Sequence, residues 1–275
     1  MTSFFAGSGR MGLIGAVASI GGLAFSPIAS GQEACPRYVG QLISPITFTS
    51  AIAPFARLAP KTEFESTVDY EARLIKTLGP ASTTPLIITR VIENRTFIEY
   101  NADTRSLRIY PGAFGHGFDA WDAFISTPYW NALNPDANNN VAVVISDPDV
   151  LVSSTVGSNA FGVRRTIKNY RRVSQAIFDH SGGALFPSSP EAIGYAIGEI
   201  PMSPEQARAL EPAISLAFVV VPKAPFLITG SRYAASPTLE VPKRVKEEFS
   251  VLIGDIQCAL VLDGNRKVLA AFATN

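Results

Sequence analysis

The sequence predicts an α+β fold that is built mainly on an antiparallel sheet and carries a few short helices. Short segments rich in isoleucine, valine, threonine and aromatic residues recur along the chain, and turn sequences separate several of them, as in antiparallel strands. Other segments begin with helix-capping residues. No internal repeat and no clear linker divides the chain, so a single main domain is expected.

The composition excludes several classes of protein. The 275 residues include 23 Lys+Arg and 23 Asp+Glu, so the formal net charge is zero, which argues against a general nucleic-acid binder. Hydrophobic residues make up 47% and charged residues 17%, which excludes a mostly disordered chain. Two histidines leave little for a His-rich metal site, and no nucleotide-binding or redox motif is present, so no cofactor is expected.

Residues 1–31 have the features of a secretory signal peptide. Arg10 is their one charged residue, an apolar stretch covers residues 11–29, and small residues at 29–31 precede the expected cleavage site. The mature chain is then a single domain over residues 32–275, which we expect to be soluble and either periplasmic or secreted. An uncleaved N-terminal membrane anchor is the alternative, because the apolar stretch can nearly span a bilayer.

The two cysteines lie far apart in the sequence, Cys35 just after the expected cleavage site and Cys258 in a late apolar segment. In an oxidising compartment they can form a disulfide. The alternative is one free thiol near the start of the mature chain and one buried thiol in a strand.

The first part of the mature chain predicts one strand and one helix. Residues 41–49 are strand-like, and Pro45 within them indicates an edge position. A helix is expected over residues 66–78, where apolar side chains recur at three and four positions and a Gly-Pro pair follows. Two capping pairs stand at its start, Thr62 with Glu65 and Ser66 with Asp69.

An antiparallel meander is expected next. Residues 85–91, 95–100 and 106–110 are short, rich in β-branched and aromatic residues, and joined by turn sequences. The asparagine-rich residues 131–140 predict a surface loop and are the best candidate for a subdivision of the domain. Residues 141–146 form an apolar run typical of a buried strand.

Residues 163–177 fit either a helix or a strand. Five apolar residues are spaced four, three, three and four positions apart: Val163, Ile167, Tyr170, Val173 and Ile177. This spacing favours a helix. In a strand, Arg165 and Arg171 would instead share a face with three of these apolar residues.

The last part of the chain predicts a short helix followed by strands. Ser203 before Pro204 indicates a helix start, and the helix is expected to reach about residue 210. Four strands are expected after it, over residues 215–221, 225–229, 249–262 and 267–273. An Asp-Gly-Asn sequence between the last two predicts a hairpin turn.

Three segments together resemble a loose group of uncharacterised exported bacterial proteins. They are PKTEFESTVDYEAR over residues 60–73, GSNAFG over residues 157–162, and the C-terminal hairpin that begins at Cys258. The group has an E-F-E-T-T-x-x-Y-x-x-R segment, in which Ser66 here replaces a threonine, and an N-A-F-G segment that leads into a strand. The resemblance implies a strand after residue 162, and it implies no activity.

Two histidines are the candidates for catalysis. His116 stands near Asp119 and Asp122 and could act as a general base or a metal ligand. The simpler interpretation is a loop histidine before an acidic helix start. His180 precedes a serine, but the sequence around it is better explained as a turn.

One pair of carboxylates follows the apolar run at 141–146. Asp147 and Asp149 could bind a divalent cation, although such a pair at a strand end more often only makes a turn.

Two segments are candidates for binding. The aromatic residues 114–130 include Trp121 and Trp130 and could form a stacking platform, with core packing as the alternative. Residues 164–172 carry five cations, and Arg164, Lys168 and Arg172 could contact an anionic surface or an acidic envelope partner. A solvated or ion-paired face is the alternative.

The sequence therefore favours a non-catalytic envelope protein that acts by binding or as a structural component. A hydrolase-type enzyme that uses His116 with Asp119 or Asp122, or His180, is the alternative.

Overall fold

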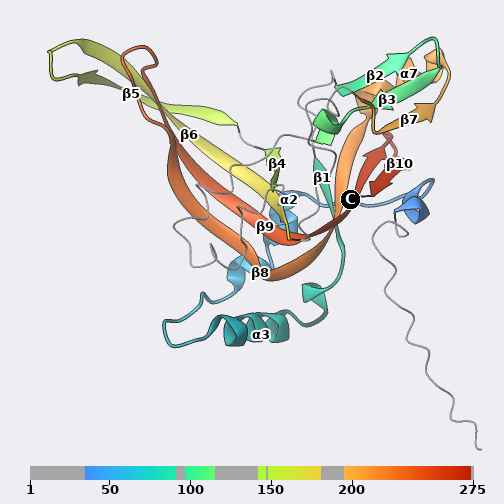
Figure 1. The fold of residues 1–275 in the computed structure, drawn as a ribbon, viewed down its shortest axis with the longest axis horizontal. Helices are drawn as coiled ribbons and strands as arrows, with labels where there is room; N and C mark the ends of the chain where they lie inside the picture. The colour runs from blue at the N-terminus through green and yellow to red at the C-terminus, as the bar shows by residue number, and fades with distance from the viewer. Residues whose placement is uncertain (1–34, 91–96, 115–141, 147, 181–194, 274–275) are drawn as a thin grey trace, which may run out of the picture.

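Figure 1 shows the fold of the computed structural model, which describes residues 35–90, 97–114, 142–146, 148–180 and 195–273. The expected signal peptide, the loop at 131–140 and several candidate site residues lie outside these ranges. The site residues concerned are His116, Asp119, Trp121, Asp122, Trp130 and Asp147.

The described residues form an α+β fold with a mostly antiparallel sheet, as the sequence predicts. The α-helices are α2 (Phe48–Ile52), α3 (Thr67–Leu78) and α7 (Pro204–Leu210), and the 3₁₀ turns are η1 (Pro36–Tyr38), η2 (Phe55–Arg57), η3 (Gly79–Ser82), η5 (Pro111–Phe114) and η6 (Glu211–Ala213). The strands are β1 (Leu86–Arg90), β2 (Ile98–Asn101), β3 (Ser106–Ile109), β4 (Ala142–Ser146), β5 (Asp149–Ser158), β6 (Arg164–Asp179), β7 (Gly198–Pro201), β8 (Ser215–Ala235), β9 (Lys243–Leu262) and β10 (Val268–Ala273). None of the helices in these ranges has the length and apolar character that a membrane crossing requires.

Two long antiparallel strands, β8 and β9, run through the larger sheet. They pair from Ser215 with Leu262 at one end to Ala235 with Val245 at the other. β1 pairs with the first part of β8, and β10 pairs with the last part of β9. The sequence predicts both strands but divides β8 in two and begins β9 too late, because apolar runs mark only the buried halves.

The other edge of β9 pairs with β6, and this pairing is parallel. It extends from Lys168 with Lys243 to Asp179 with Gly254. On its far side β6 pairs with β5 and then with β4, both antiparallel. The helix favoured by the periodicity of residues 163–177 is therefore wrong. In the strand, alternating residues point to opposite faces, so Tyr170 does not share a face with Ile167 or Val173.

The predicted three-strand meander is only partly correct, because two of its strands lie in a second, smaller sheet and the other does not. β2 and β3 form the expected hairpin, but their third strand is β7, which pairs with β3 about ninety residues further along the chain. β1 joins the larger sheet instead, where Ile88 is fully buried against β8. The small sheet and α7 lie at the end of the molecule opposite to the tip of β5 and β6 (Figure 1).

Of the local capping signals, those of Ser66 and Ser203 are confirmed, whereas the pair of Thr62 with Glu65 lies before α3 and does not cap it. Ser66 and Ser203 are the N-caps of α3 and α7, and each accepts a hydrogen bond from the backbone N–H three residues later. Gly79 follows α3 with a φ of 57°, a conformation that glycine adopts without strain. The strand expected at residues 41–49 is wrong, since only isolated bridges at Leu42 and Ile46 are formed before α2 begins.

The larger sheet is covered on both faces near its centre. On one face Leu216, Phe218 and Val220 of β8 are fully buried in the main core, with α2 and α3 packed against it. On the other face Cys35 and Cys258 form a disulfide with an S–S distance of 1.98 Å, and the cluster around it includes Val219 and Leu260. Of the two alternatives for the cysteines, the structure thus shows the disulfide.

Because this disulfide closes a loop of 223 residues, its loss should destabilise the fold. Replacing both cysteines (Cys35→Ala with Cys258→Ala) is expected to lower the free energy of unfolding by up to about 5 kcal/mol, mainly through the entropy of the unfolded chain. Denaturant unfolding of the variant and of the wild type, with and without reductant, measures this. Identical curves in all samples would contradict the prediction.

Candidate binding surface

The sheet continues beyond the core as a projection that we call the β-arm, defined as residues 149–173 and 230–249. It consists of β5, the first half of β6 and the adjoining ends of β8 and β9, and it extends away from the small sheet and the helices (Figure 1). Most side chains of β5 and of the first half of β6 are exposed, in contrast to the buried second half of β6. The β-arm is therefore held by its ladder hydrogen bonds and by side-chain pairs more than by an apolar core.

Ion pairs join the strands of the β-arm. Asp149 of β5 accepts hydrogen bonds from Arg172 of β6 at 2.8 Å and from Lys243 of β9 at 2.7 Å. These bonds, that with Arg172 foremost, lower the pKa of the Asp149 carboxyl. Lys243 also lies over the ring of Tyr170, 4.9 Å from its centroid. One carboxylate thus ties three strands together.

A second carboxylate pairs on the opposite side of the sheet. Glu248 of β9 binds Arg171 of β6, and this bond lowers the pKa of Glu248. Lys246 lies 4.0 Å from the same carboxylate. Arg171 and Arg172 of the predicted cationic segment are therefore ion-paired, and the structure does not support Arg172 as a free binding residue.

A buried carboxylate lies where the β-arm joins the core. Glu247 is only 2% exposed and is bonded by the hydroxyl of Ser174 and by the guanidinium of Arg232. Burial of a carboxylate at such a depth costs free energy unless its charge is balanced and its oxygens are hydrogen-bonded. The pair therefore fixes β8 against β9 and β6 at the root of the β-arm.

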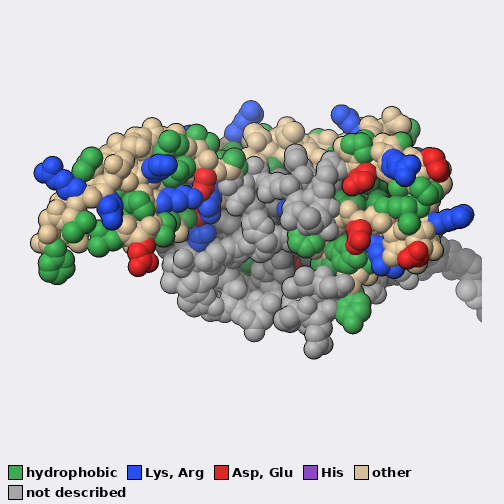
Figure 2. Space-filling view, turned by 90° about the horizontal axis from the view of Figure 1, so that it is seen from above, with side chains coloured by type: hydrophobic (Ala, Val, Ile, Leu, Met, Phe, Trp, Pro, Cys, Tyr) green, Lys and Arg blue, Asp and Glu red, His purple; other side chains and the backbone are tan. Residues whose placement is uncertain are grey.

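The remaining cations of the β-arm have no such partner. The β-arm carries nine Lys and Arg residues but four Asp and Glu, although the whole chain is neutral. Four of the nine make no ion pair with any carboxylate in the described residues, and all four are exposed: Arg164, Arg165, Lys168 and Arg244. At the β-arm end of the molecule, on the left in Figure 2, basic side chains lie among hydrophobic ones on this face.

The tip of the β-arm also exposes apolar side chains. Phe161, in the turn between β5 and β6, is 91% exposed, and Val156 of β5 is 70% exposed. Leu239 and Val241 in the turn between β8 and β9 are exposed as well. Exposed apolar groups beside unpaired cations are a feature of surfaces that bind other molecules.

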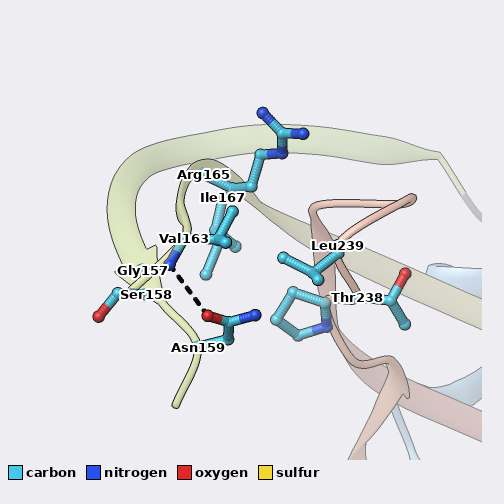
Figure 3. A pocket seen from close by; sticks show the side chains of 9 residues that line it. Gly157, Ser158, Asn159, Val163, Arg165, Ile167, Thr238 and Leu239 are labelled. Atoms are coloured by element: carbon cyan, nitrogen blue, oxygen red, sulfur yellow. Dashed lines mark hydrogen bonds between the residues drawn. The ribbon is translucent and has the colours of Figure 1, made fainter. Parts of the chain in front are cut away.

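The two turns enclose a pocket of about 240 Å³ (Figure 3). Val163 and Ile167 from one hairpin face Leu239 from the other, and the guanidinium of Arg165 points away from the space between them. Pro237 also lines the pocket. The pocket is mainly apolar, so it can accept an apolar group of a partner.

The two motifs behind the family resemblance have local structural roles. Asn159 closes the turn of the first hairpin, since its side-chain oxygen accepts hydrogen bonds from the N–H groups of Phe161 and Val163 at 3.0 Å each. Arg73 of α3 binds both carboxylate oxygens of Glu65, at 2.8 and 2.9 Å, and lies over the ring of Tyr70. These contacts stabilise the local fold, and they do not indicate a catalytic role for these residues.

The histidine that the structure describes is placed beside a carboxylate but not bonded to it. His180 follows β6, is about half exposed, and its Nδ1 lies 3.9 Å from Asp255, which pairs with Lys223 at 3.1 Å. No cluster of three or more metal-ligating side chains occurs in the described ranges. Asp149 is engaged by Arg172 and Lys243, and Phe114 of the aromatic segment is buried in the core.

Sequence reasoning found part of this surface and missed the rest. Arg164, Lys168 and the adjacent Arg165 belong to the cationic segment that the sequence identifies. The sequence does not indicate that Arg244 and the turn at 236–242 belong to this surface. They lie about seventy residues later and join it only through the pairing of β6 with β9. A cationic segment KRVK after a Pro-containing turn is the signal that could have pointed to them.

Comparisons with family models, with curated proteins and with solved structures gave no match.

The ion pairs at Asp149 predict a pH-dependent stability. Because the pKa of Asp149 is lowered in the folded state, its contribution is present above the ordinary value of 3.8 and is lost as the pH falls through the folded pKa. Asp149→Asn should cost about 1 kcal/mol at neutral pH and nothing in strong acid. Denaturant unfolding against pH measures the difference. Asp103→Asn, in a surface turn, is the control and should show none at either pH.

The buried pair at the root of the β-arm predicts a larger effect. Arg232→Met removes the guanidinium from the buried Glu247 carboxylate and should cost about 3 kcal/mol in the free energy of unfolding. The double variant Arg232→Met with Glu247→Gln removes the buried charge and should recover most of this loss. A double variant that is less stable than Arg232→Met would show that burial of the charge is not the cause.

Proposed function

We propose that this chain is a non-catalytic, exported protein of the bacterial cell envelope, and that its β-arm binds a negatively charged partner. The observation that carries the proposal is the separation of charge. The β-arm has five more cations than carboxylates, and the rest of the neutral chain has the opposite excess.

The pairing of charges supports a binding role over a purely structural one. The carboxylates Asp149, Glu247 and Glu248 all lie in ion pairs within the β-arm. The four exposed cations toward the tip are in excess of what these carboxylates can neutralise. Cations that project from an exposed sheet raise the local concentration of anions and speed their association.

The shape of the β-arm supports the same role. The four paired strands hold the cationic tip away from the core, and the ion pairs of Asp149 connect β5, β6 and β9. A stiff projection can meet a partner surface without displacing any element of the core. The apolar tip pocket adds a place for an uncharged group of that partner.

Reversal of the exposed cations tests the binding function. The variant Arg164→Glu, Arg165→Glu and Lys168→Glu should bind poly-L-glutamate or phosphatidylglycerol vesicles about a hundredfold more weakly than the wild type, since each cation contributes about 1 kcal/mol near an anionic surface. Fluorescence titration and vesicle flotation measure the two probes. Wild-type binding should also weaken as salt rises, because screening shortens the range of charge interactions.

A matched control separates a local site from net charge. Arg57→Glu, Lys76→Glu and Arg208→Glu change the net charge equally, at exposed positions outside the β-arm. This control should bind like the wild type. Equal losses in both variants, or a wild type that binds neither probe, would overturn the proposed function.

Export has its own test. The chain expressed with its N-terminus intact in a bacterial host should lose about 30 residues on its way to the envelope or the medium. Intact-mass measurement of the recovered protein determines the cleavage site. An unprocessed chain in the membrane fraction would instead support the N-terminal anchor.

A further inference from the structure

The outer edge of β5 is open in the part of the chain that the structure describes. β5 pairs with β6 along residues 149–158, and its other side pairs with no described strand. An open edge presents a row of backbone N–H and C=O groups that another extended chain can join.

This edge lacks the features that normally protect an exposed strand. Residues 150–158, VLVSSTVGS, contain no charged residue and no proline. The shift in register lies between Leu151 and Ser153, at the start of the strand, so residues 153–158 form a regular ladder with β6. Proteins usually guard such an edge with charges, prolines or bulges, so a regular and uncharged edge is suited to pairing.

The hydrogen bonds show which backbone groups face outward. The N–H of Asn159 donates to the carbonyl of Val163, next to the Ser158–Arg164 pair. Directions alternate along an antiparallel ladder, so Asn159 and the odd-numbered residues before it face β6. Ser154, Val156 and Ser158 therefore present their N–H and C=O groups to the open edge.

Charge indicates which kind of strand would fit. The three exposed cations of β6 stand opposite the smallest residues of β5: Lys168 opposite Ser154, Arg165 opposite Gly157 and Arg164 opposite Ser158. Arg164 and Lys168 share one face of β6, whereas Arg165 lies on the other face, where Ile167 already covers Gly157. The long side chains of Arg164 and Lys168 can lean over the serines opposite them toward the edge, where an added strand would lie about 10 Å from β6, two strand spacings away. Acidic side chains on that strand would reach back to them.

The same geometry disfavours a second copy of this chain as the occupant. Two β5 edges paired around a two-fold axis would direct the cations of both β6 strands toward one seam, without a carboxylate on residues 150–158 of either copy to balance them. A lipid headgroup could meet the cations and accept a hydrogen bond from a single N–H, but it could not continue the ladder along the edge.

We infer that the β-arm takes an extended, acidic segment of another polypeptide as an added strand on β5. This inference rests on the proposed function and names the class of its anionic partner. Backbone pairing with Ser154, Val156 and Ser158 provides the alignment, and Arg164 and Lys168, which share one face of β6, provide selection for acidic side chains on the same face of the added strand.

The test uses a labelled nine-residue peptide that alternates glutamate with valine or threonine, blocked at both ends, and the full mature protein. Two comparison peptides separate charge from backbone pairing. One has glutamine in place of every glutamate, and the other keeps the glutamates but has proline at every other position. Both should bind at least tenfold more weakly by fluorescence anisotropy. Amide hydrogen exchange at Ser154, Val156 and Ser158 should slow when the first peptide binds.

A pair of variants at one position tests the edge itself. Val156→Pro removes an outward N–H from the edge and should weaken peptide binding at least tenfold. Val156→Thr keeps the N–H and the β-branched shape and should bind like the wild type. If Val156→Pro proves poorly folded by circular dichroism, the exchange of the three outward amides in the wild type decides the question.

The outcomes separate this inference from the proposed function. Equal binding of the proline-containing peptide would overturn strand addition and leave an anionic binding function in place. Binding of anionic vesicles without binding of the acidic peptide would do the same and identify a membrane as the partner. A wild-type dimer that Val156→Pro dissociates would show that a second copy occupies the edge. Failure of every anionic probe would overturn both.

Discussion

The pairing of β8 with β9 is the constraint on which the rest of the structure depends. These two strands are unusually long for a globular protein, and they belong to two environments at once. Toward one end they are buried on both faces, and there they carry β1, β10 and the disulfide. Toward the other end they leave the core, and β6 and β5 follow them outward. The buried half supplies the hydrophobic stability that lets the exposed half persist as a sheet.

The β-arm also shows how an evenly charged chain can present a charged surface. A net charge of zero argues against polyanion binding only when the charges are mixed in space. Here the ladder register decides which cations are neutralised: Arg171 and Arg172 meet carboxylates of β9 and β5, whereas Arg164, Arg165 and Lys168 stand opposite small uncharged residues. The same sequence in another register would leave a different set of cations exposed.

Local signals in the sequence predicted the local structure, and pairing between distant segments could not be predicted. The serine caps of α3 and α7 and the turn at Asp263 depend on neighbouring residues, so the sequence shows them directly. The spacing of apolar residues at 163–177 matches one face of a helix, yet the segment is a strand whose first half is mostly exposed. The cationic segment was identified, but its ion-paired members and the contribution of Arg244 depend on strands some seventy residues away.

The parallel pairing of β6 with β9 has a consequence for the order of assembly. A chain that is made, or threaded through a channel, from its N-terminus completes the β5–β6 hairpin well before β9 has emerged. During that interval one side of β6 lacks its native neighbour, and Cys35 lacks its disulfide partner Cys258, which follows 223 residues later. The larger sheet can thus be completed only after β9 has been made, and until then the unpaired side of β6 is a strand edge open to aggregation.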